Sequence, residues 1–165
     1  MHPVIEFYLD QRKSEMNFSF EQMLAIEPLA IELGYFWIPW FFPVLERSKW
    51  NKKMPLLSSD EIDFFKQNEQ IQQRFLQAFD AIMAYFEIQR NGTELTITET
   101  LTQRSYWLKN IGHQQKKISR IIRSLKLLGQ EPLARNLQQL AIKLGQEKGY
   151  LLPDTLEIWQ GIFED

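Results

Sequence analysis

The feature that most constrains the fold is a run of nine residues, 35–43, which reads YFWIPWFFP and holds six aromatic rings and two prolines. The apolar stretch that contains it is eleven residues long and includes Pro39 and Pro43. It cannot cross a membrane as a helix, because a spanning helix needs about 20 apolar residues. Leaving its large side chains in water would forgo about 1.5–3 kcal/mol for each of them, a sum close to the whole stability of a domain. We therefore expect this run to be hydrophobic core and not an exposed docking surface.

Length and composition indicate an ordinary globular protein. The chain has 165 residues, of which 44% are hydrophobic and 24% charged, and this length fits one domain. It has no cysteine, which excludes disulfides, a thiolate nucleophile and a cysteine metal site. The first ten residues, MHPVIEFYLD, lack the basic start and the apolar stretch of a signal peptide. We expect a cytoplasmic protein.

Local signals predict where helices begin. Ser19 with Gln22, and Ser58 with Glu61, have the spacing of capping boxes, so helices should start at both serines. Apolar residues recur at helical spacing through residues 64–88, which predicts one long helix or two nearly collinear helices that meet around Asn68.

The second half of the chain has similar signals. Residues 90–102 contain an Asn-Gly turn signal and could form a short hairpin, although we favour an ordered loop. A helix should run over 103–128 and stop at Gly129, and another should start at 131–132 and end near Gly145 or Gly149. Pro153 should open a last short helix. We predict an all-α fold, a single-domain bundle of about five to seven helices with the aromatic, proline-containing segment in its core.

Positive charge is concentrated in one segment. Residues 100–130 contain seven basic residues and no acidic one, whereas the rest of the chain has twelve basic and twenty-one acidic residues. A helical projection places an apolar arc on one side: Ile118, Ile121, Ile122, Leu125 and Leu128. The other side is polar and positive: His113, Lys116, Arg120, Arg123 and Ser124. We expect the apolar side to enter the core.

The positive side has two interpretations. It could be a solvated stripe, paired in part with acidic neighbours, or it could be a site for an anionic partner. A pI near 5.8 argues against a dedicated nucleic-acid binder, so an acidic peptide or protein segment is the favoured partner. The candidate ligand-binding residues are Trp40, Trp107, His113, Arg120 and Arg123, with Lys116, Lys117 and Lys126 on the same basic face.

Signals for catalysis are scarce. The chain has two histidines and no phosphate-binding loop, nucleophile elbow or zinc-protease motif, so we expect no metal, no cofactor and no catalytic residue. The spacing of Asp60 and Asp63 is typical of acidic residues at a helix N-terminus. His113 could be a structural residue at a helix start or a ligand contact.

Two blocks give the chain a family resemblance. The stretch Trp37 to Pro43, and the basic block Ile118 to Leu125 with Leu128-Gly129 after it, resemble the conserved domain of the opioid growth factor receptor family. Smaller matches accompany them: Asn51, Pro55, Leu56, Phe64-Phe65-Lys66 through Phe86, and His113. The likeness covers about Phe7 to Phe163, so residues 1–165 would form a single domain of this family, similar to its short bacterial members.

The resemblance implies a function as well as a fold. The animal receptor of this family binds an enkephalin peptide, which favours a non-enzymatic module that binds a peptide or protein. The alternative hypothesis is a small enzyme that uses His113 as a base, with Arg120 and Arg123 binding an anionic substrate. The sequence predicts no oligomeric state.

Overall fold

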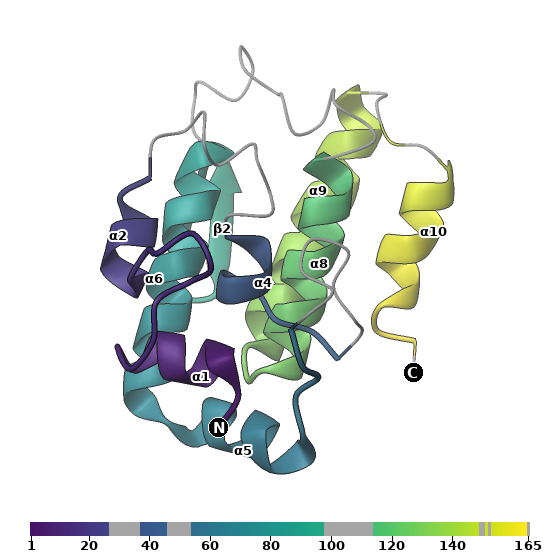
Figure 1. Cartoon of the computed structure of the whole chain (residues 1–165). Helices are drawn as coiled ribbons and strands as arrows, with labels where there is room; N and C mark the ends of the chain where they lie inside the picture. The colour runs from purple at the N-terminus through teal and green to yellow at the C-terminus, as the bar shows by residue number, and fades with distance from the viewer. Residues whose placement is uncertain (27–36, 46–53, 98–113, 149–150, 152, 165) are drawn as a thin grey trace. The chain divides into compact units, whose positions relative to one another are not determined.

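Helices dominate the architecture, with one small sheet among them (Figure 1). The computed structural model describes residues 1–26, 37–45, 54–97, 114–148, 151 and 153–164. Within these residues there are eight helices: α1 (Pro3–Tyr8), α2 (Phe20–Leu24), α4 (Ile38–Phe41), α5 (Ser59–Gln67), α6 (Glu69–Tyr85), α8 (Gln114–Leu127), α9 (Glu131–Lys148) and α10 (Pro153–Gly161). The two strands, β1 (Ile88–Asn91) and β2 (Glu94–Ile97), form an antiparallel hairpin. The fold is therefore mostly helical and not strictly all-α, and the described residues hold more helices than predicted.

The chain forms two compact units. An N-terminal unit comprises residues 1–81 and 127–129, and a C-terminal unit comprises residues 82–126 and 130–165.

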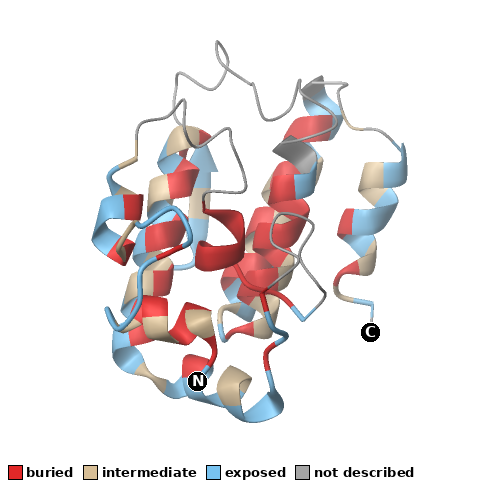
Figure 2. Ribbon diagram, in the orientation of Figure 1, coloured by how far each residue is buried: buried red, intermediate tan, exposed pale blue. Residues whose placement is uncertain are grey.

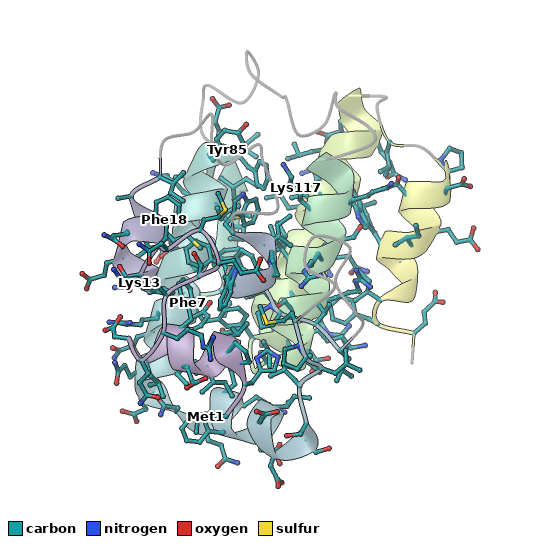
Figure 3. The ribbon with its side chains drawn as sticks, in the orientation of Figure 1. Met1, Phe7, Lys13, Phe18, Tyr85 and Lys117 are labelled. Atoms are coloured by element: carbon teal, nitrogen blue, oxygen red, sulfur yellow. The ribbon has the colours of Figure 1, made fainter. Side chains whose placement is uncertain are left out.

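The N-terminal unit is built around aromatic rings. Trp37, Trp40, Phe41 and Phe42 are all buried, with exposures of 4% or less, which confirms the prediction of core for this part of the run. Tyr35 and Phe36 lie outside the described residues. The ring of Phe7, labelled in Figure 3, lies 5.2 Å from that of Trp40 and 5.7 Å from that of Phe20. Tilted and edge-on contacts of this kind add to the stability that burial alone provides.

A side-chain hydrogen bond connects α1 to α4. The Tyr8 hydroxyl donates to the Phe41 carbonyl at 2.8 Å, and burial raises the pKa of this phenol well above its usual value. The hydroxyl of Tyr8 therefore stays protonated and satisfies a carbonyl at the C-terminal end of α4.

Both predicted capping boxes are present. The hydroxyls of Ser19 and Ser58 each accept a hydrogen bond from the backbone N–H three residues later. In return, the backbone N–H of each serine donates to the side-chain oxygen of Gln22 or Glu61. At Asn68 the chain breaks into two helices, because the Asn68 side chain accepts from the N–H of Ile71 at 3.0 Å and starts α6.

The hairpin follows directly after α6 and corrects the predicted loop. Asn91 pairs with Glu94, so the turn has two residues, Gly92 and Thr93. Gly92 has a φ of +64°, which a glycine adopts without strain and which suits the first central position of a type II′ turn.

Helix α9 runs to Lys148, so of the two predicted ends, near Gly145 or near Gly149, the second is the one observed. A glycine at position 145 lets the chain pack closely, because a Cβ atom there would lie 3.0 Å from the Cβ of Leu151.

Burial differs among the helices: α4 and most of α8 are red in Figure 2, whereas α10 has an exposed side.

Candidate functional site

The basic helix α8 ends as its sequence predicts. Gly129 has a φ of +103°, and the N–H of Gln130 donates to the Leu125 carbonyl at 2.9 Å. This is the bond of a Schellman motif, in which glycine supplies the left-handed residue that stops the helix. The predicted start near Gln103 lies outside the described residues, and the described helix begins at Gln114.

Burial of α8 extends beyond the predicted apolar side. The five arc residues are fully buried, as predicted: Ile118, Ile121, Ile122, Leu125 and Leu128. However, Lys117 and Arg120 are also buried, at 3% and 5% exposure, and Ser124 is completely buried. Both cations interact with other groups and are not free. The expectation that Lys117, Arg120 and Ser124 lie on an accessible positive face was wrong. A long basic side chain can be buried when its aliphatic stem packs and its charged head is paired. A serine hydroxyl can be buried when it has a hydrogen-bond partner.

Lys126 takes part in packing at the C-terminus. Its Nζ atom donates to the Ile162 carbonyl at 2.5 Å and lies 5.5 Å from the centre of the Phe163 ring. Arg135 of α9 lies over the same ring at 4.3 Å. Lys126 and Arg135 thus both contact the segment at the C-terminal end of α10. Lys126 bonds a carbonyl there, where positive charge is favourable, and both cations interact with the Phe163 ring.

Lys126 is half-buried and bound to the Ile162 carbonyl, which leaves two other basic residues with accessible surface in the described part of α8. Lys116 is exposed, whereas Arg123 is half-buried and also interacts with other groups. They are seven residues apart, so they lie on the same side of the helix with an axial separation of about 10.5 Å. Lys117, labelled in Figure 3, follows Lys116 directly but is buried. The accessible positive surface is therefore narrower than the sequence predicts.

Of the other candidate residues, the structure describes Trp40 alone. Trp40 belongs to the aromatic core of the N-terminal unit, with 4% exposure. Trp107 and His113 lie outside the described residues.

A groove that the sequence did not predict lies in the C-terminal unit. It is open to solvent, has a volume of about 340 Å³, and is lined by three residues of β2 and by one side of α9: Glu94, Leu95, Thr96, Asn136, Gln139, Leu140 and Lys143. The side chain of Asn136 donates to the Thr93 carbonyl at 2.6 Å, which holds the hairpin turn against α9. The Asn-Gly signal was the indication in the sequence that a strand would form here.

The described residues contain neither a metal-binding cluster nor a membrane-spanning helix. No group of three histidine, aspartate or glutamate side chains in the described ranges is arranged to hold a metal ion. None of the described helices has both the length and the apolar character needed to cross a membrane.

Comparison with known proteins gives one clear match. The family described as "Opioid growth factor receptor (OGFr) conserved region" matches residues 5–156. The chain belongs to this opioid growth factor receptor family. The opioid growth factor receptor of Mus musculus is 28% identical over 113 residues, which are 64% of this chain and 18% of the mouse protein. The matched part is thus less than a fifth of the length of that relative. No solved structure matches.

The blocks that resemble the opioid growth factor receptor family are mainly buried. In the first block, Trp40 and Phe42 are core residues, and in the second, Ile118, Ile121 and Leu125 have no exposed surface. Family membership therefore indicates how the chain packs more than what it binds. Within the second block, Arg123 is half-buried and keeps some accessible surface.

Proposed function

We propose that this chain is a non-enzymatic module that binds an acidic peptide or protein segment, with the accessible side of α8 as a contact surface. The observation that supports this most is the pair Lys116 and Arg123, two cations on one side of a helix within a segment that has no acidic residue. Surface charges of this kind speed association and select partners of opposite charge.

The other sequence-predicted residues have different parts in this proposal. Arg120 and Lys117 are buried and interact with other groups, so they are not contact residues in this proposal, while Trp40 stabilises the fold. Trp107 and His113 remain candidate ligand contacts on the sequence argument alone. The proposal treats residues 1–165 as one domain, which is supported by a family match that runs through both units. It places this domain in the cytoplasm on the sequence argument alone.

The test is a titration of the full chain with a fluorescein-labelled hexaglutamate peptide at low salt. We expect the double variant Lys116→Ala/Arg123→Ala to bind about tenfold more weakly, because each accessible charge contributes up to about 1 kcal/mol. A matched control is Lys13→Ala/Lys66→Ala, which removes two exposed cations of the N-terminal unit. Equal loss in both double variants would mean that binding follows net charge and not α8.

A further inference from the structure

We propose a second binding site, at the outer edge of β2, which accepts an extended peptide segment as an added strand in the groove between β2 and α9. It does not use Lys116 or Arg123, so it can fail or hold independently of the function proposed for α8.

The hairpin register leaves one edge of β2 available. With a two-residue turn, Asn91 and Glu94 form a hydrogen-bonded pair, and the pairs then alternate along the strands. Leu95 and Ile97 consequently occupy the positions whose backbone N–H and C=O groups point away from β1. Within the described residues the sheet has two strands, so these groups have no strand beside them. An edge of this kind is a template for a further strand.

The opposite wall of the groove suits a peptide backbone. Gln139 of α9 is exposed and lines the groove beside Asn136. A side-chain amide has both donors and an acceptor, so it can pair with the far edge of an added backbone. Leu140 is half-buried and provides an apolar surface between the polar groups. This combination favours an extended peptide over a compact apolar ligand.

Charge gives the added segment a preferred side chain at one end. Asn136 lies at the hairpin turn, and Lys143 is seven residues further along α9, about 10.5 Å away along the helix axis. An extended chain covers this length with about three residues. We infer that the segment has an acidic residue at the end near Lys143, and that the end near Glu94 is neutral or basic.

A partner peptide fits this edge better than a second copy of the chain. Stable association of two folded chains buries about 1,200 Å² or more, whereas β2 has only four residues. Three of these residues, Glu94, Thr96 and Ile97, are exposed to solvent, so this surface is available to a ligand.

The experiment uses the full chain, labelled with ¹⁵N, and the probe peptide acetyl-Val-Thr-Val-Asp-amide. We expect NMR shifts and slower hydrogen exchange at the amides of Leu95 and Ile97, and a shift of the Gln139 side-chain amide. Ile97→Pro removes an outward N–H at the end of an edge strand, where proline is tolerated, and should abolish binding. Lys143→Glu should weaken binding about fivefold. The double variant Lys116→Ala/Arg123→Ala should bind the probe as the wild type does.

A probe methylated on alternate backbone nitrogens keeps the folded protein unchanged and tests strand pairing itself. It should not bind. The proposal is overturned if the methylated probe binds equally well, if no binding is seen up to about 1 mM, or if the shifts occur away from β2 and α9. It is also overturned if the free chain is a dimer in sedimentation whose Leu95 and Ile97 amides are already protected.

Discussion

The indole nitrogen of Trp159 donates to the hydroxyl oxygen of Ser119 at 2.7 Å, and this buried bond joins α10 to α8 within the C-terminal unit. Ser119→Ala would leave the indole N–H in a dry environment without this acceptor. We expect the variant to lower the free energy of unfolding by about 1–3 kcal/mol in urea titrations. Trp159→Phe together with Ser119→Ala should lower it by less than the sum of the two single variants. Additive effects would contradict a direct interaction.

Arg74 contacts both carboxylate oxygens of Asp10, at 2.9 and 2.8 Å, and also donates to the Tyr8 carbonyl. The hydrogen bond from Arg74, more than its charge, lowers the pKa of Asp10 below its ordinary value. A lowered pKa stabilises the fold above the unfolded value of about 3.9, and this contribution is lost as the pH falls through the folded pKa. Asp10→Asn should therefore lower the Tm at pH 7, and the difference from wild type should shrink below about pH 4.

The control for this pH dependence is Glu147→Gln, which removes an exposed carboxylate of α9. Its Tm should differ little from wild type at any pH. A difference between Asp10→Asn and wild type that stays constant down to pH 2 would contradict the ion pair as its cause.

Two helical glycines make a matched pair. A Cβ at Gly145 would lie 3.0 Å from the Cβ of Leu151, whereas a Cβ at Gly161 meets nothing within 4 Å. Gly161→Ala should raise stability by about 0.5–1 kcal/mol, because alanine has the higher helix propensity. Gly145→Ala should lower stability, because the crowded contact outweighs that gain. Thermal unfolding of both variants measures this, and a stabilising Gly145→Ala would disprove the close approach to Leu151.

His2 caps the first helix and anchors it. Its Nδ1 atom accepts from the Val4 N–H at 3.1 Å, and its Nε2 atom lies 2.7 Å from the Pro55 carbonyl oxygen, so Nε2 carries the proton. His2→Asn keeps a capping side chain but loses the Pro55 bond, and His2→Ala loses both. Unfolding free energies should fall in the order wild type, Asn, Ala, with about 1–3 kcal/mol across the series. An alanine variant as stable as wild type would show that the cap contributes nothing.

Much of the helical framework could be predicted because its signals are local. The capping boxes at Ser19 and Ser58 and the stop at Gly129 depend on residues within one turn, and all three are confirmed. The hairpin was missed because β1 and β2 are four residues each, too short for alternation to outweigh a loop. The sequence left two glycines as possible ends of α9, because the close packing of Gly145 against Leu151 is a tertiary contact that no local pattern indicates.

The candidate site was harder to predict because its geometry depends on distant residues. A helical projection sorts residues by type, so it placed Arg120 in solvent although it is buried. The Nζ atom of Lys126 donates a hydrogen bond to the carbonyl of Ile162, 36 residues away, and no local pattern indicates this contact. The accessible pair that remains, Lys116 and Arg123, was part of the predicted face, whereas the groove between β2 and α9 required the strand pairing to be known.

The most direct test of the central claim, that Lys116 and Arg123 present an accessible contact for acidic segments, is a charge-swap titration. The variant Lys116→Glu/Arg123→Glu is measured against hexaglutamate and hexalysine peptides, beside the wild type and Lys13→Glu/Lys66→Glu. We predict that the α8 variant loses affinity for hexaglutamate and gains affinity for hexalysine, while the control variant keeps the wild-type preference for hexaglutamate. If both variants change alike, or if the α8 variant still binds hexaglutamate as the wild type does, the account is contradicted.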